Sequence, residues 1–406
     1  MRIEPGYHRA MTSQQLKEAI KETAYDLGFQ RTVIASLEPM ETERQEYERW
    51  LALGYAAGME YLKRNPHFRT SPQLLYPEGR SAIVVSVSYY SEVPEPPPGF
   101  FGKVARYAVG LDYHVVIRAK LRELNARIEK IAGRKILAKA YTDDVSLFEQ
   151  GLAARHGLGF AGRHTLIIGP QLMGTYNFVA ELITDLELDA DEPYQGTCGK
   201  CFRCGEGCPT DAIKFGEGVD ANKCISYLTI ENKEGIPLAL RKQLGRWVFG
   251  CDVCQDVCPY NQKPNVSPWE EFLPEKGAGH YLDLFSILDF ESQTVFHERF
   301  VHTPLRRPKL RGLTRNALTV IGNILSDVSS NRAGNKIEIS EADLSRGVSK
   351  LIAFLQSEPE DMLKEHAYWA LAQHDCSETR KKLHLALANE KSADVRQRIS
   401  DYSDIV

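Results

Sequence analysis

The amino-acid sequence predicts a chain of three parts: an α/β domain, a cysteine-rich domain and an all-helical domain. β-Branched segments alternate with amphipathic helical segments in the first part. Eight of the nine cysteines fall between positions 198 and 258. Short apolar helical patterns recur after position 310. We therefore expect three domains, at 1–185, 186–290 and 291–406.

The composition is that of an ordinary globular protein. Hydrophobic residues make up 43% and charged residues 26% of the 406 positions, which is enough for two or three cores. No segment approaches the roughly 20 apolar residues that span a bilayer, and the first 15 residues lack the apolar stretch of a signal peptide. We expect a cytoplasmic protein with no membrane association. Because the cytoplasm is reducing, the cysteines are expected to be ligands or thiols rather than disulfides.

The first part shows the elements of an α/β domain in order. An amphipathic helix is expected from Ser13, a good N-cap residue, to Gly28, a residue type that commonly ends helices. Glycines in "GLGFAGRHTLIIG" lack the strand-then-helix context of a dinucleotide-binding motif, and no Walker A motif is present. NAD and ATP are therefore poor candidates for the cofactor. The other expected elements are strands at 31–37, 81–90 and 135–143, and helices at 113–132 and 147–156.

The cysteine spacing favours iron-sulfur clusters over zinc. Residues 198–209 have the pattern C-x2-C-x2-C-x3-C-P of bacterial ferredoxins, and residues 251–259 have a similar C-x2-C-x3-C-P. The cysteine before the proline ligates the other cluster in such proteins, whereas zinc ribbons use two separated C-x2-C pairs. Cys376 has no partner in the sequence and is expected to be a simple thiol. Crossed ligation predicts two 4Fe-4S clusters, one on Cys198, Cys201, Cys204 and Cys258, and one on Cys208, Cys224, Cys251 and Cys254.

A basic stretch opens the helical part. Residues 301–315, "VHTPLRRPKLRGLTR", contain no acidic residue, although the whole chain has a net charge of -4. A local basic stripe on an acidic protein indicates contact with an anionic surface such as a phosphate backbone, and the alternative is a solvated helix face. The short helices that follow are typical of a HEAT-like solenoid. The stripe consists of Arg306, Arg307, Lys309, Arg311 and Arg315.

Strings spread along nearly the whole chain match one family. They are "GMEYLKRN", "LYPEGRSAIVVSVSYY", "RYAVGLDYH", "GLGFAGRHTLII", "AELITDLEL" and "TPLRRPKLRGLTRNA", in order with both cysteine sets. In these features the chain resembles the epoxyqueuosine reductases, cobalamin and iron-sulfur enzymes that complete the queuosine modification in tRNA. The resemblance implies an α/β cobalamin-binding domain, a ferredoxin-like double-cluster domain and C-terminal HEAT-like repeats that bind tRNA.

The resemblance also implies a reaction and its partners. Epoxyqueuosine at the wobble position of a tRNA with a GUN anticodon would be reduced to queuosine. Cob(I)alamin would supply the electrons after the clusters reduce it, and a flavodoxin or ferredoxin would be the external donor to a monomeric enzyme. The family's proton donor is an aspartate in a D-x-x-P-L-x-E motif, which is "DDVSLFE" here. Asp143 therefore aligns with the acid and Glu149 with the later carboxylate, and Ser146 replaces the proline.

The sequence leaves alternatives open at the site. Asp144 is the neighbouring rival of Asp143, and both aspartates are also plausible caps of the helix expected near Leu147. His114 is not expected to ligate cobalt, because Ile117 stands where the D-x-H-x-x-G motif needs glycine. The residues expected to line a cobalamin pocket are Arg106, Tyr107, Asp112, Tyr113, His114, Arg163, His164 and Thr165.

Two other functions are compatible with the cysteine pattern. A reductive dehalogenase-like enzyme would share cobalamin and two clusters, but its small substrate would need no basic repeat domain. A non-catalytic corrinoid or electron carrier would keep the clusters but would have no use for Asp143 or the basic stripe. Retention of tRNA by the protein distinguishes these functions from the reduction of epoxyqueuosine.

Overall fold

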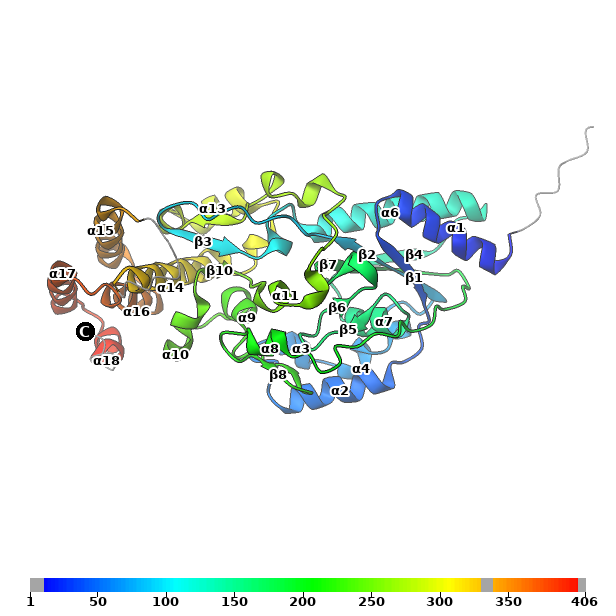
Figure 1. Ribbon diagram of the computed structural model, residues 1–406, viewed down its shortest axis with the longest axis horizontal. Helices are drawn as coiled ribbons and strands as arrows, with labels where there is room; N and C mark the ends of the chain where they lie inside the picture. The colour runs from blue at the N-terminus through cyan, green and yellow to red at the C-terminus, as the bar shows by residue number, and fades with distance from the viewer. Residues whose placement is uncertain (1–10, 330–338, 401–406) are drawn as a thin grey trace, which may run out of the picture.

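The structure is a computed structural model and describes residues 11–329 and 339–400. The molecule is elongated, with the N-terminal α/β part at one end and the C-terminal helices at the other (Figure 1). The cysteine-rich segment lies between these two ends. The ends of the expected first and third domains, 1–10 and 401–406, lie outside the described residues.

The α/β part is built on a four-stranded sheet in which all three strand pairings are antiparallel. The second strand is buried at every position, as expected for a central strand rich in valine. The strand beside it was not among the predicted elements, and it forms the centre of the sheet together with the second strand. The order is β1 (Arg31–Ala35), β2 (Ser81–Ser88), β7 (Asn177–Thr184) and β4 (Ala138–Tyr141).

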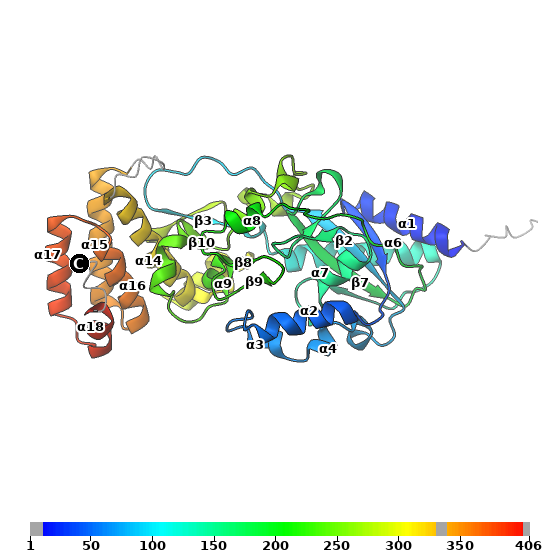
Figure 2. The same ribbon diagram turned by 60° about the horizontal axis from the view of Figure 1, so that its bottom comes forward.

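Helices cover both faces of this sheet (Figures 1 and 2). On one face α1 (Ser13–Asp26) and α6 (Tyr113–Ala132) share a core with alternate residues of the strands. On the other face α7 (Glu149–Arg155) packs on the sheet, and α2 (Glu41–Ala52) lies outside it. Three single-turn helices complete this side: α3 (Glu60–Lys63), α4 (Pro66–Arg69) and α5 (Pro72–Leu75).

The helix ends follow capping rules. α6 spans the predicted residues because the Asp112 carboxylate accepts the His114 amide at its start and Gly133 adopts a left-handed conformation at its end, with φ 64°. The prediction for α1 was one residue late: Thr12 is the N-cap, and its hydroxyl accepts the amide of Gln15. Ser13 is the first helical residue.

The cysteine-rich segment contains only short elements. Each ferredoxin-type motif wraps around a single helical turn, α8 (Arg203–Glu206) or α11 (Val253–Asp256), and these two turns contact one another. A hairpin of two very short strands and two further short helices complete the segment. They are β8 (Ile213–Lys214), β9 (Gly218–Val219), α9 (Ile225–Ile230) and α10 (Leu238–Arg241).

A second, three-stranded sheet joins distant parts of the chain. β3 (Phe101–Val104) follows a proline-rich loop at 92–100. It pairs with β10 (Trp247–Phe249) in parallel and with β11 (Tyr281–Asp283) in antiparallel orientation. The largest core of the molecule extends from this sheet into the C-terminal helices, with α16 packed against its helical neighbours. These helices are α12 (Leu284–Leu288), α13 (Gln293–Phe300), α14 (Lys309–Ser329), α15 (Glu341–Ser357), α16 (Asp361–Ala372), α17 (Ser377–Ala388) and α18 (Ala393–Ser400).

Within the described residues, every helix is too short or too polar to cross a bilayer.

Candidate active site

A cavity of about 420 Å³ lies where the α/β sheet meets the cysteine-rich segment. The sheet contributes Phe178 and Val179 from the start of β7, and α6 and α7 contribute their first residues. All four cysteines of the second predicted set also line the cavity. The polar and sulfur-bearing side chains around the cavity are Tyr89, Tyr107, Tyr113, Thr142, Asp143, Glu149, Gln150, His164, Thr165, Asn177, Cys208, Thr210, Cys224, Ser226, Cys251, Asp252, Cys254 and Gln255.

Asp143 lies on the wall of this cavity, in the loop between β4 and α7. Its side chain accepts a hydrogen bond of 2.7 Å from the hydroxyl of Tyr113, and its amide donates to Oε1 of Glu149 at 2.6 Å. Its backbone is left-handed, with φ 53°, a conformation that aspartate and asparagine tolerate better than most residues. The N-cap position of α7 is occupied by Phe148, and no side chain caps this helix end. Asp143 therefore does not serve as the cap of α7.

Asp144 has a different environment, although it is adjacent in sequence. Its carboxylate pairs with Arg118 of α6 at 2.7 Å and also accepts the amide of Thr142 at 3.1 Å. Asp144 is not among the residues that line the cavity. The structure therefore separates the two rivals: Asp143 is at the cavity, and Asp144 is held in an ion pair beside it.

Glu149 is in contact with a second buried carboxyl group, that of Glu181. Glu181 lies in the middle of β7 and is fully buried. Burial, the contact between the two carboxyls and the nearby Asp143 raise the pKa of both glutamates well above the ordinary value. Glu181 was not predicted as a site residue, although a single acidic residue within the apolar strand "NFVAELIT" was a usable signal.

His164 supplies a neutral donor at the cavity. Nδ1 of this buried ring accepts the amide of Leu166 at 3.2 Å, which leaves the proton on Nε2. Burial lowers the pKa of His164 to about 4, so the ring is uncharged at neutral pH. Nε2 is buried and has no hydrogen-bond partner among the described residues. His164 is positioned by the short hairpin of β5 (Phe160–Ala161) and β6 (Ile167–Ile168).

The thiols of the first predicted cysteine set lie near one another. The thiol of Cys258 interacts electrostatically with Cys198 and Cys201, and burial raises its pKa. Cys204 interacts with Cys198 and Cys258 in the same way. Within residues 11–329 and 339–400, no three His, Cys, Asp or Glu side chains converge on a site for a single metal ion. The first predicted set is therefore a loose group of thiols drawn from both motifs.

The second set is also drawn from both motifs, and it faces the cavity. Cys251 interacts with Cys208 and Cys224, and Cys254 interacts with Cys251 and Cys224. Burial raises the pKa of both Cys251 and Cys254. Cys254 also interacts with Cys204, so the two sets are neighbours.

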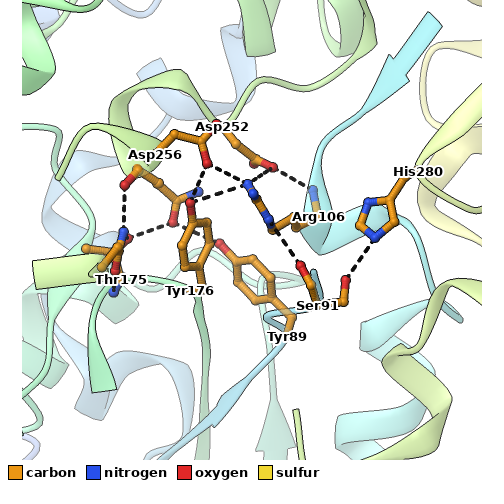
Figure 3. A network of polar contacts seen from close by, with 10 residues as sticks. Tyr89, Ser91, Arg106, Thr175, Tyr176, Asp252, Asp256 and His280 are labelled. Carbon is orange, nitrogen blue, oxygen red and sulfur yellow. Dashed lines mark hydrogen bonds and ion pairs between the residues drawn. The ribbon is translucent and has the colours of Figure 1, made fainter. Parts of the chain in front are cut away.

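Arg106 binds the second cysteine loop instead of lining the cavity (Figure 3). Its guanidinium donates to Asp252 at 3.1 Å and to Asp256 at 2.7 Å, and its amide donates to Asp252 at 2.9 Å. The hydroxyl of Tyr176 donates to the same Asp256 oxygen at 2.7 Å. Asp252 is buried, and burial raises its pKa to about 6. Arg106 therefore connects the α/β part to the loop that carries Cys251 and Cys254.

The other predicted pocket residues are divided in the same way. Tyr107, Tyr113, His164 and Thr165 line the cavity. Arg163 does not: its guanidinium donates to the carbonyls of Cys201 and Gly199 at 3.0 and 2.8 Å, which supports the first cysteine loop. Asp112 and His114 bind each other at 2.7 Å at the start of α6, also away from the cavity lining.

The basic stripe is mostly exposed, with one exception. Arg306, Arg307, Lys309 and Arg311 are exposed, but Arg315 is fully buried. The Arg315 guanidinium donates to the carbonyls of Leu228, Asn232 and Glu234 at 2.6 to 2.7 Å. The prediction that Arg315 contacts a nucleic acid was therefore wrong, because this side chain has no surface and its donors are occupied by backbone carbonyls.

The exposed stripe lies close to the cavity. Arg307 forms an ion pair of 2.6 Å with Glu231, and its guanidinium lies 5.9 Å from the centre of the Tyr61 ring. The Tyr61 hydroxyl also interacts electrostatically with Asp143. Tyr61 thus lies near Arg307 of the stripe and within the electrostatic influence of Asp143.

Comparison with known proteins gives the same family from sequence and structure. Residues 69–144 match the family model of the epoxyqueuosine reductase QueG, and residues 197–261 match that of the 4Fe-4S double cluster binding domain. The epoxyqueuosine reductase of Leadbetterella byssophila is 38% identical over 73% of this chain and 95% of its own, and that of Escherichia coli is 31% identical over 88% and 89%.

Solved structures agree with this assignment. A crystal structure of an epoxyqueuosine reductase with an epoxyqueuosine-modified stem loop of tyrosine tRNA superposes with a TM-score of 0.83 and 26% identity, over 97% of this chain and 99% of the other. A Bacillus subtilis epoxyqueuosine reductase, with its catalytic aspartate loop swung out of the active site, superposes with a TM-score of 0.82 and 26% identity, over 97% of this chain and all of the other. The chain belongs to the epoxyqueuosine reductases.

Proposed function

We propose that this reductase converts epoxyqueuosine at the wobble position of a tRNA with a GUN anticodon to queuosine. The observation that carries the proposal is the cavity, which is lined both by Asp143 and by the second cysteine set. A proton donor and an electron carrier are the two components that reductive removal of an epoxide oxygen needs. The similar structure with a modified stem loop supports a tRNA substrate.

The two cysteine sets are proposed to hold the clusters that the matched double-cluster domain implies. Crossed ligation is supported by the grouping of Cys258 with the first motif and of Cys208 with the second. The second set would hold its cluster at the cavity wall, and the first set would hold the outer cluster. An external flavodoxin- or ferredoxin-type donor would reduce the outer cluster, which is the one farther from the substrate.

The cavity residues fit a cobalamin. His164 offers an unpaired Nε2–H, and the hydroxyls of Tyr107 and Thr165 are further polar groups of the cavity lining. Donors of this kind suit the rim of amide side chains on a corrinoid. Such a group supplies the electrons for reduction of the carbon–oxygen bond when it is bound. His114 is not among the residues that line the cavity.

Asp143 is proposed to deliver a proton to the epoxide oxygen. The Tyr113 hydroxyl and the Glu149 carboxylate hold its side chain and its backbone, so that the carboxyl stays at the cavity wall. Burial and their mutual contact raise the pKa of the neighbouring Glu149 and Glu181, so further carboxyl groups that can carry a proton lie beside Asp143. The catalytic aspartate loop of the Bacillus subtilis enzyme supports an aspartate in this role.

Four basic side chains are proposed to bind the tRNA backbone. Arg306 and Lys309 are exposed, and Arg307 and Arg311 are exposed although they pair with Glu231 and Glu360. Because Tyr61 lies near Arg307 and within the electrostatic influence of Asp143, a phosphate bound here would lie close to the cavity that receives the modified base. The stripe thus places an anionic strand beside the proposed acid.

Further proposals concern the C-terminal helices, the domain bounds, the oligomeric state and the cellular location. The C-terminal helices α14 to α18 are proposed to be HEAT-like repeats, and the three domains are proposed to span 1–185, 186–290 and 291–406. The enzyme is proposed to act as a monomer in the cytoplasm.

An anaerobic conversion assay tests the function. Protein reconstituted with iron, sulfide and cobalamin should convert epoxyqueuosine in a tRNA stem loop to queuosine when a chemical reductant is added. Samples without cobalamin, or with all eight motif cysteines alkylated before reconstitution, are the controls and should give no product. A protein that binds zinc but no iron, or that leaves the modified stem loop unchanged with both cofactors bound, would overturn the proposal.

A further inference from the structure

A pair of glutamates, Glu181 fully buried and Glu149 partly buried, lies next to the proposed acid. Glu181 is fully buried in β7 between Val179 and Ile183, and both of its carboxyl oxygens lack a hydrogen-bond donor among the described residues. Its neighbour is Glu149, the first residue of α7, which lines the cavity. Glu149 in turn accepts the amide of Asp143. The two glutamates therefore lead from the core of the sheet to the backbone of Asp143 at the cavity.

Electrostatics requires a proton within this pair. An unpaired carboxylate among apolar residues is costly to bury, and two touching carboxylates cannot both ionise at neutral pH. The charged groups that act on the pair are Asp143 and Asp144, both acidic, and Arg118 of α6 is engaged with Asp144. The neighbouring charges thus favour the protonated form of the pair, whereas the Asp143 amide, which donates to Glu149, favours the ionised form of that one glutamate. A proton shared between Glu181 and Glu149 also supplies the hydrogen bond that Glu181 otherwise lacks.

The stoichiometry of the reaction gives this proton a use. Conversion of an epoxide to an alkene breaks both carbon–oxygen bonds, consumes two electrons and two protons, and releases the oxygen as water. The electrons come from the external reductant of the proposed function. A single carboxyl such as that of Asp143 delivers only one proton at a time, so a second proton must reach the oxygen during the same turnover.

We propose that the Glu149–Glu181 pair stores the second proton and passes it to Asp143. The proton moves from Glu181 to Glu149, then to the Asp143 carboxylate left by the first transfer, and finally to the departing oxygen. Glu149 and Glu181 regain a proton from solvent after the product leaves. This inference rests on the proposed function, because it assigns the pair to the same deoxygenation.

The test uses Glu181→Gln in the full-length, reconstituted enzyme. Glutamine keeps the shape and still donates a hydrogen bond to Glu149, but it cannot release a proton. Glu187→Gln, an exposed change on the loop after β7, is the matched control. Infrared spectroscopy in H₂O and D₂O should show a protonated buried carboxyl at neutral pH in the parent protein, and Glu181→Gln should lose that band. Single-turnover conversion by Glu181→Gln should slow by about 10- to 100-fold, with iron and cobalamin content unchanged.

Each outcome decides the proposal. Absence of a protonated carboxyl band from the parent protein at neutral pH would overturn it, whether or not the variant folds. A Glu181→Gln enzyme with the parental single-turnover rate would overturn it too. If that variant fails to fold, Glu149→Gln gives the same comparison, because its side-chain amide oxygen still accepts a hydrogen bond from the Asp143 backbone amide. A parent enzyme that leaves the stem loop unconverted while showing the carboxyl band would instead refute the proposed function.

Discussion

Replacement of Asp143 by asparagine separates proton donation from structural support. The Asn side-chain oxygen still accepts the Tyr113 hydroxyl at about the present 2.7 Å, and asparagine suits a left-handed backbone as well as aspartate does. The free energy of unfolding should therefore change by less than about 1 kcal/mol. Loss of the acid should lower turnover by about 10² to 10⁴, which corresponds to about 2.7 to 5.4 kcal/mol in the activation barrier.

The assay is single-turnover conversion of a modified stem loop with enzyme in excess, together with thermal unfolding and iron content. Asp144→Asn is the matched control, because it breaks only the partly exposed pair with Arg118 and should cost at most about 1 kcal/mol of stability and little activity. Full turnover by Asp143→Asn would show that the reasoning is wrong. Loss of turnover in the Asp144 variant alone would move the acid by one residue.

Three further predictions follow from the geometry. Cys258→Ala should remove iron from the set that contains Cys198, as measured by iron content and Mössbauer spectra, and iron loss limited to the other set would contradict crossed ligation. Arg306→Gln combined with Lys309→Gln should weaken tRNA binding and lower the salt slope by roughly 0.7 to 0.9 per lost phosphate contact, whereas an unchanged slope would exclude these contacts. Arg315→Met should cost about 3 kcal/mol or more in unfolding free energy, because three buried carbonyls lose their donor, and a parental melting temperature would contradict the buried role.

The elements with strong local signals were predictable from the sequence. The helix at 113–132 has an N-cap aspartate, a left-handed glycine after its last turn and a regular apolar face, and the structure confirms its bounds. β7 was missed because its apolar run is interrupted by Glu181, whose burial depends on a partner in α7. The second sheet was missed because β3, β10 and β11 have three or four residues each and meet only in the folded chain.

The sequence predicted those site residues whose type permits few roles, such as closely spaced cysteines and the motif aspartate. Asp143 and four cysteines line one cavity, as their motifs indicate. Sequence patterns could not show which cationic side chains are exposed, because a buried and an exposed arginine look alike in a sequence. Arg315 follows Arg311 by one helical turn, yet the first is fully buried and the second is exposed.

Three arginines that do not line the cavity, Arg106, Arg163 and Arg315, have a common structural role. The cysteine-rich segment has short helices and only small cores of its own, and such segments need support from outside. Arg163 holds the first cysteine loop through backbone carbonyls, and Arg106 holds the second through Asp252 and Asp256. Arg315 holds the turn after α9, the helix that follows Cys224. Because each arginine comes from a different part of the chain, the position of the cysteine sets relative to the cavity is determined by the fold of the whole molecule, and a change at any of the three should disturb both the retention of iron and the alignment of the second set with Asp143.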